Sequence, residues 1–269
     1  MDGQDVEAHY DRRSDLTESL LAALRDAGRD PDDLSRGDLD GVAEFHVRGR
    51  AVTRELARLA DLDAGERVLD VGCGLGGPAR TLAAEYGCRA VGLDRTGAFL
   101  RAARELTARV GLADEVTFVR GDALAPPVAD GAFDAAFLQH VGPNVPDEAR
   151  LLDACAAALR PGGRLAVYEI FAGDGDLHYP VPFASDPGEA RLSTPETFAE
   201  RAAAAGFERL TWTDDTAACL DWYESMDGPP AVGLGVVMGE EFPAMGRNVR
   251  RNLAEGRAAV WRGVFERRA

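Results

Sequence analysis

The sequence predicts an α/β fold with a doubly wound, mostly parallel sheet. From residue 67 onward, short apolar runs alternate with segments of helical periodicity. Apolar strands separated by helices are typical of parallel βαβ units that are buried on both faces. The first apolar run passes directly into a glycine-rich segment, residues 72–77, and then into a helix. In such folds the ligand lies beyond the carboxyl ends of the strands, so we expect the functional site at that edge of the sheet.

Seven strands and four helices account for the predicted core. The apolar runs predict five strands in succession, and two more follow the insertions near the end of the chain, the last of them antiparallel. The expected strands are residues 67–71, 89–93, 116–119, 133–138, 164–170, 207–213 and 258–267. The expected helices are residues 79–86, 98–110, 148–159 and 195–205, the last of them capped by Thr194.

Three insertions are expected around this core. Residues 1–60 should form an amino-terminal helical cap, with an acidic turn at residues 30–35, and residues 61–269 the core itself. Residues 173–192 are rich in Gly, Asp and Pro and are too long for a simple connection, which predicts a lid over the ligand. Residues 217–257 are expected to add a helical insertion over the same edge of the sheet.

The composition limits the classes of partner. The 269 residues carry a formal charge of −16, and no lysine occurs, so all 30 basic residues are arginine. This charge argues against nucleic acid or an anionic membrane as a partner and favours a small or cationic substrate. An acidic, lysine-free composition resembles that of proteins from salt-loving, halophilic organisms with GC-rich genomes.

Neither a membrane span nor a metal centre is predicted. No stretch approaches the ~20 apolar residues that cross a bilayer, and the first residues are acidic rather than basic and apolar, which predicts a cytoplasmic protein. The four cysteines lie far apart without a CxxC pair. Neither a disulfide framework nor structural zinc is therefore expected.

Three acidic residues lie at or just beyond the ends of the first three strands, at the edge where the ligand is expected. Asp70 precedes the glycine loop by two residues, Asp94 ends the second strand, and Asp122 follows the third. The loop alone is ambiguous, because it also contains the GxGxxG spacing of dinucleotide sites. Three carboxylates would repel a pyrophosphate and stabilise a ligand with ammonium and sulfonium charges. Taken singly, Asp94 could equally be a strand-end or helix-capping carboxylate, and Asp122 a turn residue.

The segment Val68-Leu-Asp-Val-Gly-Cys-Gly-Leu-Gly-Gly-Pro-Ala resembles the first motif of class I S-adenosylmethionine-dependent methyltransferases. The resemblance extends over roughly residues 40–215 and includes the position of each acidic residue. It implies a Rossmann-like fold, S-adenosyl-L-methionine as cofactor and S-adenosyl-L-homocysteine as product. It also implies the cofactor-binding residues, which hold the methionine part (Asp70, Gly72, Cys73, Gly74 and Gly76), the ribose (Asp94, with Arg95 beside it), the adenine (Asp122 and Ala123) and the sulfonium side (Gln139).

Two amino-terminal segments resemble a subgroup that contains sarcosine and dimethylglycine N-methyltransferases and ubiquinone- or menaquinone-type C-methyltransferases. They are Glu7-Ala-His-Tyr-Asp and Glu44-Phe-His-Val-Arg-Gly-Arg. The resemblance implies that Tyr10, His46 and Gly49 fold over the cofactor. The alternative is that Tyr10 and His46 simply pack the cap.

Candidate substrate residues follow the fourth and fifth strands and lie in the insertions. His140 is the candidate catalytic residue, either as a base for a hydroxyl or carbon acid or as a pocket residue that transfers no proton. Glu169 would face the substrate or remain a solvated rim charge. Tyr179, Phe183 and Trp222 would form an aromatic wall for a cationic amine, or bury the insertions themselves.

The predicted activity is methyl transfer to a small-molecule acceptor. A small amine such as sarcosine or dimethylglycine is the preferred acceptor class, and an isoprenoid quinone or other lipophilic molecule, methylated on carbon or oxygen, is the alternative. Two hypotheses from other classes are a nicotinamide-dependent oxidoreductase, for which a chain without lysine has no Tyr-x-x-x-Lys pair, and a catalytically silent binding module. A homo-oligomer, the acceptor atom and the number of methyl groups stay open.

Overall fold

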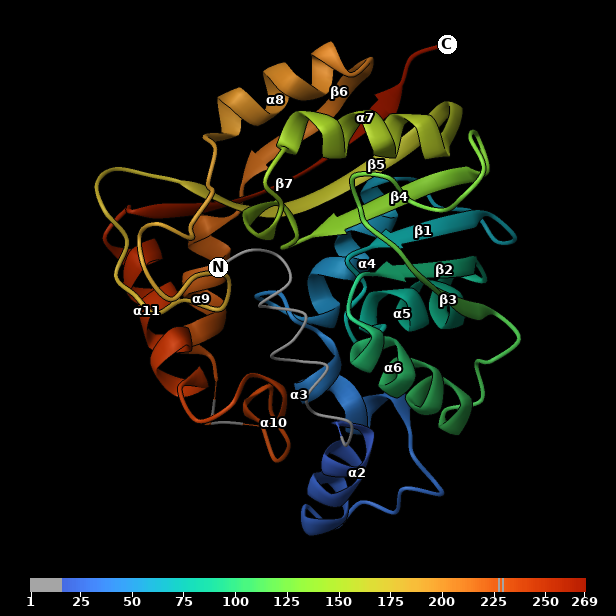
Figure 1. Cartoon of the computed structure of the whole chain (residues 1–269), viewed down its shortest axis with the longest axis vertical. Helices are drawn as coiled ribbons and strands as arrows, with labels where there is room; N and C mark the ends of the chain where they lie inside the picture. The colour runs from blue at the N-terminus through green and yellow to red at the C-terminus, as the bar shows by residue number, and fades with distance from the viewer. Residues whose placement is uncertain (1–15, 227, 229) are drawn as a thin grey trace.

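The computed structural model describes residues 16–226, 228 and 230–269 and contains one sheet. Its strands are β1 (Arg67–Val71), β2 (Arg89–Asp94), β3 (Val116–Arg120), β4 (Phe133–Gln139), β5 (Leu159–Ala172), β6 (Phe207–Asp214) and β7 (Ala258–Arg267). The strand order is β3-β2-β1-β4-β5-β7-β6 (Figure 1). Pairing is parallel from β3 to β5, whereas β7 runs antiparallel between β5 and β6. The predicted doubly wound sheet and its antiparallel last strand are confirmed.

The winding of the sheet reverses between β1 and β4. β1 pairs with β2 on one side and with β4 on the other, so that Asp70 lies opposite Gly92 and Phe137. In open α/β sheets, ligands bind beyond the carboxyl ends of the strands at such a reversal. Asp70 and Gln139, near the ends of β1 and β4, therefore lie at the expected ligand site.

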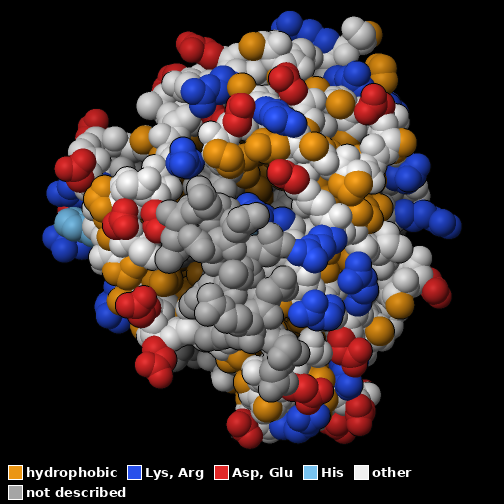
Figure 2. All heavy atoms as spheres, in the orientation of Figure 1, with side chains coloured by type: hydrophobic (Ala, Val, Ile, Leu, Met, Phe, Trp, Pro, Cys, Tyr) orange, Lys and Arg blue, Asp and Glu red, His pale blue; other side chains and the backbone are white. Residues whose placement is uncertain are grey.

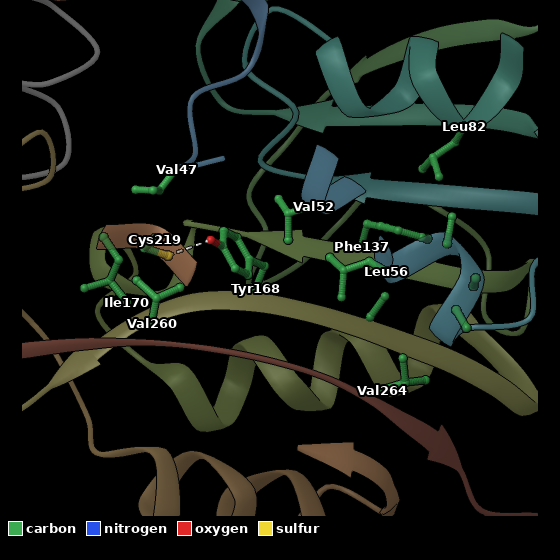
Figure 3. Close-up of a cluster of buried hydrophobic side chains, with 14 of the residues drawn as sticks. Val47, Val52, Leu56, Leu82, Phe137, Tyr168, Ile170, Cys219, Val260 and Val264 are labelled. Atoms are coloured by element: carbon green, nitrogen blue, oxygen red, sulfur yellow. Dashed lines mark hydrogen bonds between the residues drawn. The ribbon is translucent and has the colours of Figure 1, made fainter. Parts of the chain in front are cut away.

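Helices cover both faces of the sheet (Figure 1). On one face lie α4 (Arg50–Leu59), α5 (Gly77–Tyr86) and α6 (Gly97–Arg109), and on the other lie α7 (Glu148–Ala158) and α8 (Pro195–Ala204). Each face buries a separate apolar core, one around Leu56 and Phe137 (Figure 3) and one around Leu138 and Leu151. Burial on both faces explains why the strands read as apolar runs without alternation.

The amino-terminal segment is helical in pieces rather than throughout. It comprises α2 (Leu16–Asp26), the 3-10 helix η1 (Arg36–Leu39), α3 (Asp40–Ala43) and α4. The predicted acidic turn precedes η1, where Ser35 and Asp38 form a reciprocal cap. Residues 44–49 interrupt the helices, and α4 packs on α5 and β5 as part of the sheet core although it precedes residue 60.

The late insertion contains α9 (Thr216–Glu224), α10 (Gly235–Met238) and α11 (Phe242–Ala254). The prediction of a helical insertion over residues 217–257 is wrong for the described part of 225–234, where Gly228 (φ 99°) and Pro230 interrupt the helix. Residues 173–192 are irregular, as expected. Among the described residues, no helix is long and apolar enough to cross a membrane.

Residues 173–192, which we call the lid segment, lie against α11. The Asn252 amide pairs with the main chain of His178: its oxygen accepts from the N–H at 2.8 Å and its nitrogen donates to the carbonyl at 3.1 Å. Asn248 likewise donates to the Pro180 carbonyl at 2.9 Å. Side-chain amides thus form hydrogen bonds with main-chain groups of the lid segment that a regular helix or sheet would otherwise pair.

β5 begins five residues earlier than the sequence suggested. Helix α7 ends at Ala158, and Leu159 is already extended (φ −81°, ψ 144°) and pairs with Phe133. The register is irregular before Arg164 pairs with Ala135. The segment that was expected to stop a helix therefore forms an irregular start of the strand.

Candidate functional site

The glycine loop between β1 and α5 requires glycine for two reasons. Gly72, Gly74 and Gly76 have φ angles of 70°, 51° and 77°, in the left-handed region. In addition, a β-carbon on Gly72 would lie 2.5 Å from the Val141 side chain, and one on Gly76 would lie 2.7 Å from the Phe118 ring. A larger residue at either position would displace the loop.

Asp70 lies beneath this loop near the end of β1. Its carboxylate accepts a hydrogen bond from the Ala79 main-chain N–H in the first turn of α5 (3.1 Å), and the residue is 2% exposed. Burial, reinforced by the charges of Glu44 and Asp94, raises the pKa of Asp70 to about 8. A cationic ligand beside this buried acid would favour its ionised form.

Asp94 connects the end of β2 to the glycine loop. One carboxylate oxygen accepts a hydrogen bond from the Gly74 N–H at 2.9 Å, and the other accepts one from the Thr96 N–H at 2.8 Å, at the start of α6. Burial raises the pKa of Asp94, although these two bonds act in the opposite direction. Each oxygen keeps a further lone-pair site, so contacts to two ribose hydroxyls fit beside the backbone bonds.

The other predicted cofactor residues on this side lie nearer the surface. Arg95 and Asp122 are exposed, and Ala123 is half-buried. Asp122 accepts a hydrogen bond from the main-chain N–H two residues later (2.9 Å), which is the turn role considered above. The Gly121 N–H donates to the Asp94 carbonyl at 3.0 Å, so the chain leaves β3 directly beside Asp94.

Cys73 lies within the glycine loop, and its buried thiol donates a weak hydrogen bond to the Gly74 carbonyl at 3.9 Å. Its side chain belongs to the apolar core that includes Phe118, and its sulfur lies 2.8 Å from a β-carbon built on Gly92. All four cysteines are buried free thiols. A contact between Cys73 and the cofactor would therefore involve its backbone.

Residues 44–49, which we call the cap loop, cross the glycine loop. The Phe45 ring lies 3.5 Å from a β-carbon built on Gly74, and the Glu44 carboxyl carbon lies 2.9 Å from one built on Gly77. Glu44 is only 6% exposed. It is a third carboxyl beside the loop, after Asp70 and Asp94, and it was not among the predicted site residues although it stands in the Glu44-Phe-His segment.

His46 and Gln139 meet above the end of β4. The Nε2 atoms of the two side chains lie 3.1 Å apart, and Gln139 Nε2 also donates to the Thr53 hydroxyl at 3.1 Å. His46 Nε2 lies 3.0 Å from Glu44 Oε2. Gly49 (φ 50°) precedes α4 immediately after this turn. The structure brings His46 and Gln139 together, and their contact with the cofactor stays a prediction; Tyr10 lies outside the described residues.

His140 has a backbone conformation that is rare for a residue with a side chain. Its φ is 55°, which costs about 1 kcal/mol. Its N–H donates to the Tyr168 carbonyl at 2.9 Å, and the two rings stack with centroids 5.1 Å apart and planes at 8°. Burial and the nearby His46 hold the pKa of His140 well below its usual value, so the ring is neutral. Its Nε2 is buried without a hydrogen-bond partner among the described residues.

Tyr168 of β5 packs against one face of the His140 ring. It is fully buried, and its hydroxyl lies 3.0 Å from the Cys219 sulfur of α9 (Figure 3). Its ring also meets His46 edge-on at 6.0 Å between centroids. Tyr168 was not among the predicted site residues; the available signal was an aromatic residue directly before the acidic residue Glu169 in the carboxyl half of β5.

Glu169 is 1% exposed, which excludes the rim-charge alternative. Its Oε1 accepts hydrogen bonds from the Val141 and Gly142 N–H groups at 2.8 and 3.1 Å. Burial raises the pKa of Glu169 to about 8. The side chain is therefore committed to the turn after β4.

Tyr179, Phe183 and Trp222 are half-buried and pack on one apolar core. Phe183 lines an apolar cavity of about 10 Å³ beneath the lid segment, and Trp222 contacts Tyr223 edge-on. Within the described ranges, no ring contact joins the three residues. Their placement favours burial of the insertions, and the aromatic wall stays a prediction.

An ion-pair network around the buried Asp215 connects the cap loop to the late insertion. Arg48 contacts Asp215 at 2.5 Å and binds Glu55 through both terminal nitrogens at 2.6 and 3.0 Å. Arg262 contacts Asp215 at 2.9 Å and Glu55 at 3.1 Å. Asp215 is 4% exposed. Because these residues come from the cap loop, α4, the N-cap of α9 and β7, no local sequence pattern predicted the network.

Replacing Asp70 by asparagine is expected to raise the stability of the ligand-free protein at neutral pH. The folded protein binds the Asp70 proton more tightly than the unfolded chain, so this stabilisation is complete below about pH 4 and is lost as the pH rises through about 8. Urea unfolding at pH 5 and at pH 7 measures the stability of both proteins. The stability of Asp70→Asn relative to the unsubstituted protein should be about 1–2 kcal/mol higher at pH 7 than at pH 5. The exposed Asp63→Asn is the control, and equal pH slopes would mean that Asp70 is ionised in the fold.

The carboxylates around the glycine loop suit a cationic ligand with sugar hydroxyls better than a pyrophosphate. A helix N-terminus attracts phosphate through its free N–H groups, but Asp70 already accepts the Ala79 N–H of α5. Asp94 and Glu44 add two more carboxyls beside the same loop. These residues fit S-adenosylmethionine and disfavour the nicotinamide dinucleotide hypothesis.

Comparison with known proteins agrees with this geometry. Residues 69–167 match a family model described as a methyltransferase domain. Methyltransferase GfsG of Streptomyces halstedii is 35% identical over 167 residues, which are 62% of this chain and 58% of that protein. Sterol 24-C-methyltransferase of Eremothecium gossypii is 30% identical over 182 residues, 64% of this chain and 49% of that protein. The chain thus spans about half the length of the curated relatives that it matches.

Solved structures share the fold. The [4+2]-cyclase SpnF superposes with a TM-score of 0.63 at 23% identity and covers 93% of both chains. A candidate sarcosine dimethylglycine methyltransferase from Galdieria sulphuraria gives 0.64 at 19% identity, over 86% of this chain and 95% of that chain. At these identities the likeness establishes the fold alone. The family match and the fold together identify residues 69–167, which carry the glycine loop and its acidic surround, as a methyltransferase domain.

Proposed function

We propose that this protein transfers a methyl group from S-adenosylmethionine to a small-molecule acceptor. The observation that carries the proposal is the group of three carboxyls around the glycine loop, of which Asp70 and Glu44 are buried and Asp94 is partly buried. Carboxyls gathered in one buried place stabilise ammonium and sulfonium charges, and Asp94 is placed to accept hydrogen bonds from ribose hydroxyls. When bound, the cofactor supplies an activated methyl group on a sulfonium.

His140 is the residue that we propose faces the acceptor. An acceptor atom that gains a methyl group and bears a proton must lose that proton, and a neutral imidazole nitrogen can receive it. The buried, neutral Nε2 of His140, one strand away from Asp70, has this property. For an amine acceptor that is already deprotonated, alignment alone would supply most of the effect.

The surroundings of His140 favour an uncharged acceptor. Its ring contacts are Tyr168 and His46, and Arg48 of the cap loop is already paired with Glu55 and Asp215. A zwitterion such as sarcosine needs an available cation for its carboxylate. We therefore favour a lipophilic acceptor with a hydroxyl or carbon nucleophile, which the sterol methyltransferase relative supports by its name. The small-amine class is the second candidate, supported by the structure from Galdieria sulphuraria.

We further propose that the protein acts in the cytoplasm on small molecules rather than on nucleic acid. A formal charge of −16 disfavours approach to a polyanion. On the face shown in Figure 2, acidic and basic side chains are interspersed, and several acidic groups lie near α2. Binding of duplex DNA at 50 mM salt would contradict this proposal.

Replacing His140 by alanine is expected to lower methyl transfer about 100-fold and to leave the affinity for S-adenosylhomocysteine within about threefold. The assay follows transfer of a labelled methyl group from S-adenosylmethionine to a panel that contains sterols, quinols, sarcosine and dimethylglycine. His178→Ala, in the lid segment, is the control because, within residues 16–226, 228 and 230–269, the hydrogen bonds of His178 go to Asn252 of α11 and to the adjoining residue Glu255. Failure of the unsubstituted protein to bind S-adenosylhomocysteine would overturn the proposed function, and binding without any transfer would indicate a silent module.

A further inference from the structure

Glu169 makes an unusual contact for a carboxyl at the end of a buried strand. One of its oxygens receives hydrogen bonds from two consecutive main-chain N–H groups, those of Val141 and Gly142. The side chain is 1% exposed, and its carboxyl carbon lies 3.6 Å from a β-carbon built on Gly142. The contact is short, buried and directed at backbone rather than at open space.

These two N–H groups belong to the turn that follows His140. The left-handed conformation of His140 is unfavourable by itself and persists only where neighbours hold it. Tyr168 holds the residue from one side, through its carbonyl and its stacked ring. Glu169, the next residue of β5, holds the following turn from the other side.

The same turn also borders the cofactor loop. The Val141 side chain fills the space that a β-carbon on Gly72 would occupy, at 2.5 Å. The turn continues into η2 (Gly142–Asn144), where the Val145 N–H donates to the Gly142 carbonyl at 3.0 Å. A single carboxyl therefore orders a turn that carries His140 at one end and packs on the glycine loop.

We propose that Glu169 is a positioning residue that holds His140 toward the acceptor by binding the N–H groups of Val141 and Gly142. This inference rests on the proposed function, because it assigns His140 to the acceptor. It differs from the expectation that Glu169 itself contacts the substrate. In this role Glu169 needs only an oxygen that accepts two hydrogen bonds, and no charge.

Two substitutions separate the positioning role from direct contact. Glu169→Gln keeps an acceptor oxygen in the same place, and it is a close match because burial already favours the neutral acid. Glu169→Leu has similar size but no acceptor, and it leaves both N–H groups unsatisfied. Asp153→Leu, an exposed carboxyl on α7 beside the same face of the sheet, is the matched control. Circular dichroism and thermal unfolding establish that each variant is folded.

The first readout is the imidazole titration of His140 by NMR in protein with labelled histidine, where only four histidines occur and His140→Gln identifies the signal. We expect Glu169→Gln and Asp153→Leu to leave His140 uncharged down to low pH. Glu169→Leu should release the ring and move its titration toward the ordinary value of about 6.5. An unaltered His140 signal in folded Glu169→Leu would overturn the proposal, whether or not transfer is found. If Glu169→Leu does not fold, a changed His140 signal in Glu169→Gln overturns it.

The second readout is methyl transfer to whichever member of the panel is methylated. Glu169→Leu should lower kcat about 10- to 100-fold with little change in KM, whereas the kcat of Glu169→Gln should stay within about threefold of the unsubstituted protein. The double variant Glu169→Leu with His140→Ala should be no slower than His140→Ala alone. A raised KM in Glu169→Gln would instead assign Glu169 to direct contact with the acceptor. If S-adenosylhomocysteine does not bind the unsubstituted protein, the proposed function fails, while the NMR result still decides the positioning role.

Discussion

Replacing Asp94 by alanine is expected to weaken the binding of S-adenosylhomocysteine by about 100- to 1000-fold. The change removes the hydrogen bonds that fix the Gly74 and Thr96 backbone, as well as the proposed contacts to the ribose. A hydrogen bond to a charged group contributes about 1.5–3 kcal/mol, and 1.4 kcal/mol corresponds to a tenfold change in affinity. Loss of two such bonds to the ligand alone accounts for the lower bound. Isothermal titration calorimetry on the purified protein measures this change.

The control for this experiment is Asp130→Ala, which removes an exposed carboxylate from the loop before β4. It should leave the affinity unchanged. Asp94→Asn should fall between the two, because an amide keeps one acceptor oxygen. Equal affinities of Asp94→Ala and the unsubstituted protein would show that the ribose does not bind at Asp94.

Replacing Asp215 by alanine is expected to lower the free energy of unfolding by about 3–5 kcal/mol. Asp215 is buried and pairs with both Arg48 and Arg262, so its loss leaves two guanidinium groups to share the single carboxylate of Glu55. Removing one partner of a buried ion pair is costly because the remaining charge is desolvated and uncompensated. Urea unfolding followed by circular dichroism gives the change.

Asp221→Ala, which removes an exposed carboxylate from α9, is the matched control and should change the stability by less than about 0.5 kcal/mol. Because Arg48 lies in the cap loop, Asp215→Ala should also loosen that loop and weaken cofactor binding modestly. A loss of stability below about 1 kcal/mol would place the network among ordinary surface ion pairs.

Much of the sheet could be predicted because its signals are local. The ranges expected for β1 and β7 agree with the structure, since continuous apolar runs bounded by charges and glycines mark buried strands. The end of α7 was misplaced by one residue and the start of β5 by five, because Leu159 leaves the helix to pair with Phe133 and the strand then passes through an irregular Pro-Gly-Gly segment. The continuous late helix was wrong because Gly228 and Pro230 interrupt it.

The residues of the candidate site likewise fall into those with a local sequence signal and those without one. Asp70, Asp94 and the glycine loop lie at strand ends, and parallel strands bring their carboxyl ends to one edge, so the order of the elements was enough to place them together. Glu44 and Tyr168 carry no such signal. The first is placed by a cap loop that crosses the core, and the second depends on which face of β5 is buried against α9.

The sequence alone determined the doubly wound sheet, its glycine loop and the two carboxyls, Asp70 and Asp94, beside that loop, because these features depend on local strand, loop and helix signals in successive βαβ units. Only the tertiary structure decided that Glu169 binds the turn after His140 and that Arg48 meets Asp215 across 167 positions of the chain. It also packed Tyr179, Phe183 and Trp222 against the apolar core around Leu56 and Phe137. Such contacts join segments whose local conformations are compatible with many partners, and packing of the whole core selects one of them.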